Sequence, residues 1–123
     1  MENSKFSFEK LIVWQKSRAM VKSTYLILNQ FPKVEQFALC DQMRRAVISI
    51  SSNIAESCGQ SSNKEKSYFL DFALGSAMEL YSQYTLALDL EYITKEFFDA
   101  VALDIKEISR MISGLKKNYD LKS

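Results

Sequence analysis

The sequence of 123 residues contains no histidine, one proline, three glycines and two cysteines. Histidine is the commonest general base and the commonest metal ligand, so its absence removes the usual basis for catalysis or a zinc site. The cysteines form no Cys-x-x-Cys pair and the glycines stand singly, which excludes a redox or zinc motif and a phosphate-binding loop. We therefore predict that the protein is not an enzyme and holds no metal or cofactor.

Long apolar runs are also missing. No run approaches the roughly 20 residues of a membrane-spanning helix, and Met1–Lys5 lacks the apolar core of a secretory signal. Cys40 and Cys58 are too few for a secreted disulfide scaffold and fit a reducing compartment. On one helix they would lie about 27 Å apart, too far for a disulfide. We expect a cytoplasmic protein without a membrane partner, whose cysteines are small buried residues.

The two halves of the chain differ in charge, although the formal net charge is only +1. Residues 1–50 carry eight Lys or Arg against four Asp or Glu, whereas residues 51–123 carry eight against eleven. Such asymmetry can create a basic face or steer the association of copies. The cations predicted to contact phosphates, if nucleic acid is bound, are Lys10, Lys16, Arg18, Lys22 and Arg44. The alternative is that they form an ordinary solvated helix face.

Helix boundary signals divide the chain into four segments, over residues 7–30, 35–58, 63–89 and 95–117. Pro32 ends the first segment, and Gly59 follows the second where a left-handed residue is expected. Ser62 and Thr94 are suited to cap the third and the fourth. Long helices joined by short loops favour antiparallel neighbours. We predict an all-α fold with a single domain over residues 1–123, an antiparallel up-down four-helix bundle.

The third segment is apolar around nearly its whole circumference. Between Tyr68 and Leu88 only Asp71 and Glu79 are charged. A four-helix monomer buries about one stripe of each helix, so a helix as apolar as this one needs a second surface that covers it. The first segment shows a similar excess. We therefore predict a homo-oligomer, with an unusually apolar monomer as the alternative.

Polar and small residues follow one side of the second segment, among them Asn53 and Glu56. Such residues allow close helix approach and can fix register through hydrogen bonds. Glu79 shares a helical side with apolar residues, which makes it a candidate buried carboxylate with Arg44 or Arg45 as its counter-ion. We interpret Arg45, Asn53, Glu56 and Glu79 as structural or assembly residues. The alternative for Glu79 is a ligand-binding or catalytic carboxylate.

Five blocks of sequence resemble the bacterial four helix bundle protein family: Phe8–Gln15, Phe31-Pro32, Gln42–Ala46, Ser49–Glu56 and Gly75–Leu80. Members of that family were first noticed as reading frames inside intervening sequences of large-subunit ribosomal RNA genes. The family is also similar to the accessory variability proteins of diversity-generating retroelements, which work with a reverse transcriptase and RNA. The resemblance covers about residues 6–117 and implies a homopentameric ring of four-helix bundles.

The resemblance implies a non-enzymatic accessory or assembly factor associated with RNA or a ribonucleoprotein. Its partners would be further copies of itself and RNA or a reverse transcriptase. Two departures lower the expected affinity for phosphates. Ser57 stands where the family usually has glycine, and the chain is nearly neutral, whereas the retroelement proteins are strongly basic. The alternative function is a structural or protein-interaction oligomer that binds no nucleic acid.

Overall fold

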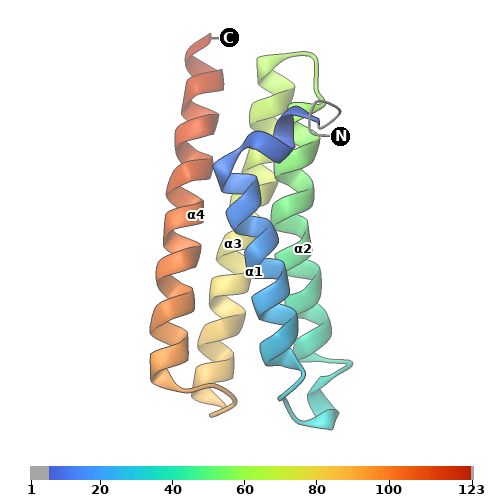
Figure 1. Cartoon of the computed structure of the whole chain (residues 1–123), viewed down its shortest axis with the longest axis vertical. Helices are drawn as coiled ribbons and strands as arrows, with labels where there is room; N and C mark the ends of the chain where they lie inside the picture. The colour runs from blue at the N-terminus through green and yellow to red at the C-terminus, as the bar shows by residue number, and fades with distance from the viewer. Residues whose placement is uncertain (1–5, 123) are drawn as a thin grey trace.

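The computed structural model describes residues 6–122, which form four long helices and two short 3-10 turns (Figure 1). The elements in chain order are a 3-10 turn Ser7–Lys10, α1 Ile12–Leu28, a 3-10 turn Lys33–Glu35, α2 Leu39–Cys58, α3 Asn63–Asp89 and α4 Lys95–Lys122. No strand occurs among these residues. Successive helices run in opposite directions side by side (Figure 1). The prediction of an all-α, up-down four-helix bundle is therefore confirmed.

The predicted domain over residues 1–123 includes Met1–Lys5 and Ser123, which lie outside the described residues, as does the segment tested for a secretory signal. The domain assignment therefore stays a prediction. Within residues 6–122, no helix combines the length and the apolar content that a membrane-spanning segment needs.

The first predicted helix, over residues 7–30, is interrupted near its start. Leu11 has an extended backbone (φ −73°, ψ 126°) that separates the first 3-10 turn from α1. The ring of Phe8 then packs edge-on against the ring of Trp14, with centroids 4.9 Å apart. Gln15 also donates a hydrogen bond from Nε2 to the backbone oxygen of Glu9 at 2.9 Å. These contacts fold the turn back over α1, which a continuous helix could not do.

Two other helix ends differ from the prediction. The second helix begins at Leu39, not at residue 35, because a 3-10 turn precedes it. The fourth helix was predicted to end at residue 117 but continues to Lys122. Its extra turn is held by an ion pair of 3.0 Å between Lys116 and Asp120. The amine of Lys66 on α3 also lies 5.9 Å from the ring centroid of Tyr119 and fixes this turn against α3.

The predicted caps of α3 and α4 are confirmed. The N–H of Glu65 donates to Ser62 Oγ at 3.1 Å, and the N–H of Phe97 donates to Thr94 Oγ1 at 3.1 Å. The prediction for Gly59 is wrong, because its backbone is right-handed (φ −84°, ψ −5°). The N–H of Gly59 bonds back to the preceding turn and closes α2 in a conformation that any residue can adopt.

The left-handed residue lies instead between α3 and α4, at Glu91 with φ 63°. The N–H of Glu91 bonds to the oxygen of Leu88 at 3.0 Å, and the N–H of Tyr92 bonds to the oxygen of Ala87 at 2.9 Å. This pair of hydrogen bonds is the Schellman arrangement, in which glycine is the usual left-handed residue. The chain uses a glutamate there and bears the steric cost of its Cβ.

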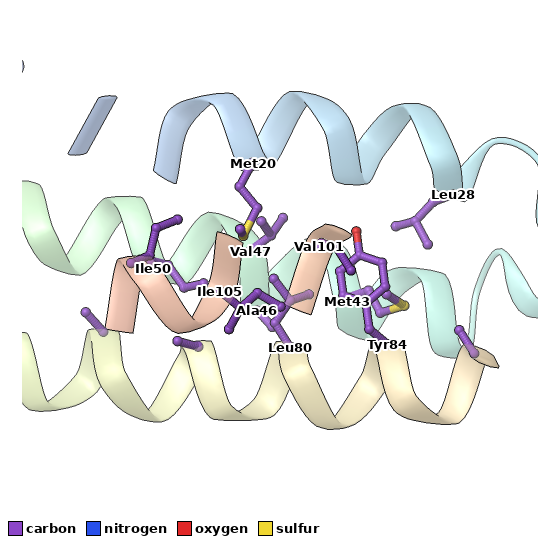
Figure 2. Close-up of a cluster of buried hydrophobic side chains, with 14 of the residues drawn as sticks. Met20, Leu28, Met43, Ala46, Val47, Ile50, Leu80, Tyr84, Val101 and Ile105 are labelled. Carbon is purple, nitrogen blue, oxygen red and sulfur yellow. The ribbon is translucent and has the colours of Figure 1, made fainter. Parts of the chain in front are cut away.

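The core runs along the bundle axis, and all four helices contribute to it (Figure 2). The labelled side chains that meet in the interior are Met20 and Leu28 from α1, Met43, Ala46, Val47 and Ile50 from α2, Leu80 and Tyr84 from α3, and Val101 and Ile105 from α4. The contact between α1 and α4 is the least extensive of those between neighbouring helices. The core is thus strongest around α2 and α3.

A single polar contact crosses this core between α1 and α3. Tyr84 is fully buried, and its hydroxyl lies 2.7 Å from the hydroxyl of Thr24. Burial raises the pKa of Tyr84 to about 12, because the charged phenolate would lose its hydration. The pair satisfies two buried hydroxyls at once and fixes the level at which α1 meets α3.

Candidate functional site

The five cations predicted to contact phosphates do not lie on one face. Lys16 faces α4, where its amine lies 3.0 Å from a carboxylate oxygen of Glu107. Asp104 and Glu107 line the same hollow, about 270 Å³ in volume, between α1 and α4. A lysine that is already paired beside a second carboxylate adds little to the attraction of a phosphate. The structure therefore separates Lys16 from the other predicted cations.

The other cations of the N-terminal region are exposed. Arg18 and Lys22 lie one turn apart on α1, so that both point to the same side. The guanidinium of Arg18 lies 5.6 Å from the centroid of the Trp14 ring. Lys10 is exposed at the end of the first 3-10 turn. Three cations are therefore available to solvent here, and one of them, Arg18, lies beside an aromatic ring.

Arg44 is half-buried and serves the structure of the bundle. It donates from Nη1 to the backbone oxygen of Gln36 at 3.2 Å and from Nη2 to the side-chain oxygen of the same residue. Its guanidinium lies 5.8 Å from the centroid of the Tyr25 ring on α1. The group therefore ties α2 to α1 and to the preceding loop, and two of its five N–H donors are already engaged.

The predicted polar side of α2 faces α3. Asn53 donates from Nδ2 to the backbone oxygen of Ser49 at 2.9 Å and to its hydroxyl at 3.0 Å. The hydroxyl of Ser76 on α3 donates to Ser49 Oγ at 2.7 Å. Glu56 is exposed one turn after this network. The contact fixes the register between the two helices and places Arg45 of α2 near the level of Glu79 of α3.

The prediction that Glu79 is buried and paired with Arg44 or Arg45 is wrong within a single chain, whereas its role in assembly stays a prediction. Glu79 is exposed, and its carboxylate accepts a hydrogen bond of 3.4 Å from Nε2 of Gln83. Arg45 pairs with Asp41 on its own helix at 3.4 Å. The residues that share a helical side with Glu79 were identified correctly, but that side faces solvent. The exposed fractions of Tyr68, Phe72 and Leu86 are 57%, 49% and 49%.

These residues belong to a continuous exposed row on α3, which we name the α3 seam. Its six members, all exposed, are Tyr68, Phe72, Gly75, Glu79, Ser82 and Leu86. Their spacing alternates between four and three residues. This is the 3.5-residue period with which helices in coiled coils contact a partner helix. The α3 seam lies outside the buried core of the bundle, and its large side chains keep about half of their surface in water.

The described residues offer little that could perform chemistry. Over residues 6–122 no three Asp, Glu or Cys side chains converge in a way that could hold a metal ion. Both thiols are free, and Cys40 is fully buried whereas Cys58 is half-buried. Burial raises the pKa of the Cys40 thiol and disfavours its reactive thiolate. The prominent features of these residues are therefore exposed apolar side chains, such as those of the α3 seam, and exposed cations.

Residues 9–114 match the family described as 23S rRNA-intervening sequence protein. The chain belongs to this family. Among solved structures, it is similar to a protein of unknown function from the S23 ribosomal protein family of Bacteroides thetaiotaomicron VPI-5482. The sequences are 26% identical, the match covers 86% of this chain and 99% of the other, and the TM-score is 0.79. No curated protein matches the chain. The resemblance to retroelement accessory proteins stays a prediction.

The sequence did not predict one exposed surface of this member of the 23S rRNA-intervening sequence protein family, which lies between α3 and α4. Between α3 and α4, the rings of Tyr81 and Phe98 meet at a centroid distance of 5.9 Å. The amine of Lys106 lies 5.8 Å from the Tyr81 centroid, and that of Lys95 lies 5.7 Å from the Phe98 centroid. The available signal was Leu103, an apolar residue that stands next to Asp104 and close to Lys106 and Glu107 in the sequence.

Proposed function

We propose that the protein is a non-catalytic cytoplasmic assembly protein, which forms a homo-oligomer through the α3 seam. The observation that carries this proposal is the coiled-coil spacing of six exposed residues along α3. Tyr68, Phe72 and Leu86 each leave about half of their surface in water. Burial of such surface against another helix is favourable by about 1 kcal/mol for each side chain.

Gly75 supports contact with another chain. It lies in the middle of α3, where glycine destabilises a helix by about 1 kcal/mol relative to alanine. A Cβ at this position would meet no atom within 4 Å, apart from the backbone of its own helix. Packing inside the bundle therefore does not require glycine here. Close approach of a second backbone along the α3 seam would account for it.

The charges beside the α3 seam favour a second copy as the partner. Glu79 interrupts the apolar row with a carboxylate, and the side chain of Arg45 on the neighbouring helix is 75% exposed. Both residues lie at nearly the same level of the bundle, so two copies of this face can pair the arginine of one with the glutamate of the other. A ring of five subunits comes from the family resemblance alone.

Sedimentation velocity of single variants tests the proposed interface. Phe72→Glu places an unpaired charge in the α3 seam, and desolvation of that charge costs several kcal/mol, enough to dissociate the oligomer. Phe37→Glu makes the same chemical change at a side chain that is 95% exposed in the loop before α2. We expect Phe72→Glu to sediment as a monomer and Phe37→Glu to sediment as wild type. Dissociation by neither variant would refute the role of the α3 seam.

Gly75→Ala separates folding from association. The added methyl group should stabilise the isolated chain by about 0.5–1 kcal/mol, because alanine favours the helix. The same methyl group should weaken the oligomer, because it blocks close approach of the partner helix. Circular dichroism measured on a Phe72→Glu background gives the first effect, and sedimentation of the single variant gives the second.

RNA association is a second candidate function, favoured by the exposed cations Lys10, Arg18 and Lys22 of the N-terminal region. Such cations attract the phosphates of a nucleic acid. Each subunit presents few cations, so strong binding would depend on the avidity of an oligomer. A reverse transcriptase as partner is implied by the resemblance alone.

The RNA candidate is tested with Lys10→Glu/Arg18→Glu/Lys22→Glu, and Lys16→Glu serves as the comparison because Lys16 is already paired. Binding of a single-stranded RNA should weaken steeply with salt, as counterion release requires. The triple variant should abolish binding, while the comparison variant should retain most of it. Equal binding by all three proteins, or none by wild type at ~50 mM salt, would leave the protein-assembly function alone.

A further inference from the structure

The groove between α3 and α4 is a second exposed surface, separate from the α3 seam. Two adjoining hollows of about 390 and 410 Å³, which share Tyr81 and Lys106, make up this groove. We name it the α3–α4 groove and define it by Met78, Tyr81, Phe98, Leu103, Lys106 and Arg110. From Phe98 to Arg110 the axis of α4 rises about 18 Å, which is roughly three turns of a helix.

The walls of the groove are apolar and its rim is cationic. The exposed fractions of Met78 and Leu103 are 54% and 68%, and both side chains line the depression. Lys106 and Arg110 lie one turn apart on α4, so they point to the same side. Neither cation lies within 4.0 Å of a carboxylate oxygen of residues 6–122. Two unpaired cations therefore border an apolar surface.

A buried hydroxyl in the same depression has no partner. Ser109 lines the hollow beside Met78, and its Oγ is buried without a hydrogen bond to any described residue. Because this Oγ is itself enclosed, it is no anchor for a ligand. The groove therefore offers apolar contact surface with two cations at its rim.

We propose that the α3–α4 groove binds an acidic amphipathic α-helix of another protein. Apolar side chains on one face of that helix pack against Met78 and Leu103, the two most exposed apolar residues of the groove. Its Asp or Glu residues pair with Lys106 and Arg110 at the rim. This is the helix-in-groove mode of recognition, in which anchors at spacings of three and four residues enter an apolar channel.

Two features favour a peptide helix over a nucleic acid in this groove. The rings of Tyr81 and Phe98 are already stacked by Lys106 and Lys95, so they offer little free face to a base. Lys95 is also neutralised by its ion pair with Asp99. A single-stranded nucleic acid needs open aromatic faces and a row of free cations, whereas the groove offers covered rings, the aliphatic side chains of Met78 and Leu103, and two cations.

The test uses a synthetic peptide and the intact protein. The probe is a fluorescein-labelled peptide of about 14 residues, helical in design, with leucine at every third or fourth position and glutamate on both flanks. A second peptide has lysine in place of every glutamate. Fluorescence anisotropy should give a Kd of roughly 10–100 µM for the acidic peptide, and the lysine peptide should bind at least tenfold more weakly.

Charge reversal locates the site. Lys106→Glu/Arg110→Glu should weaken binding of the acidic peptide at least about tenfold, because attraction at the rim becomes repulsion. Leu103→Ala should weaken it severalfold and leave its salt dependence unchanged. Lys33→Glu/Lys64→Glu makes the same change of charge at exposed lysines that do not line the groove, and should bind as wild type. Circular dichroism checks that each variant remains helical.

Four results would overturn the proposal. One is that Lys106→Glu/Arg110→Glu binds the acidic peptide as tightly as Lys33→Glu/Lys64→Glu does. Another is that the lysine peptide binds as well as the acidic one, since the rim would then make no contribution to selectivity. The third is displacement of the peptide from the groove by a single-stranded RNA of similar length, which would assign the groove to nucleic acid. Absence of peptide binding at ~1 mM refutes it equally.

Discussion

Removal of one hydroxyl from the Tyr84–Thr24 pair should destabilise the fold more than removal of both. Tyr84→Phe leaves the Thr24 hydroxyl buried and without its partner, and Thr24→Val does the same to Tyr84. Each single change should lower the free energy of unfolding by about 1–3 kcal/mol. The double variant has apolar groups of nearly the same shape on both sides, so its cost should be smaller than the sum of the two single costs.

The same pair predicts a loss of stability at high pH. The pKa of Tyr84 is raised to about 12 in the folded protein, whereas an exposed tyrosine titrates near ~10. The folded state therefore holds this proton more tightly than the unfolded state. This difference in pKa adds about 2–3 kcal/mol to the free energy of unfolding below pH ~10. That stabilisation is lost progressively as the pH rises from ~10 to ~12. Tyr84→Phe should remove this part of the pH dependence.

Urea unfolding followed by circular dichroism measures both effects. The four proteins of the cycle are compared at neutral pH, and wild type and Tyr84→Phe are compared again at pH ~11. We expect the free energies of unfolding of wild type and Tyr84→Phe to differ less at pH ~11 than at neutral pH. Costs of the single variants that add up in the double variant would refute the reasoning, because independent hydroxyls show no coupling.

Two further predictions concern the ends of helices. Glu91→Gly should raise the free energy of unfolding by about 1 kcal/mol, because glycine adopts the left-handed backbone at φ 63° without a steric cost. Thermal unfolding measures this gain, and Glu91→Ala, which should give no gain, is the control. In the native protein, Cys58 should react with an aromatic disulfide reagent well before Cys40, because the Cys40 thiol is fully buried and its pKa is raised. Simultaneous reaction of both thiols would contradict the burial of Cys40.

Local signals predicted the helices well, and tertiary contacts account for the ends that differ. Ser62 and Thr94 cap their helices as expected, because a cap acts through the residues next to it. The break at Leu11 and the last turn of α4 depend on ring contacts with other elements, which local sequence does not specify. Glu91 gave no signal, because the usual glycine is absent from its turn.

The sequence predicted which residues share a side of α3, but not which side faces the core. α3 is apolar nearly all round, so no polar stripe marks the solvent side. Glu79 was therefore assigned to the wrong environment together with correctly grouped neighbours. The sequence also did not show that the cations of α1 face different neighbours. Lys16 lies beside Glu107 of α4, whereas Arg18 lies on another side of α1. Which helices are neighbours in the bundle decides such questions.

The molar mass of the wild-type protein in solution tests whether the α3 seam joins copies of this chain. Light scattering coupled to size exclusion, at neutral pH and micromolar concentration, should give an integral multiple of 14.2 kDa. The resemblance favours a multiple of five. A mass of 14.2 kDa, unchanged as the concentration rises, would show that the exposed row from Tyr68 to Leu86 does not join copies of this chain, and would contradict the account.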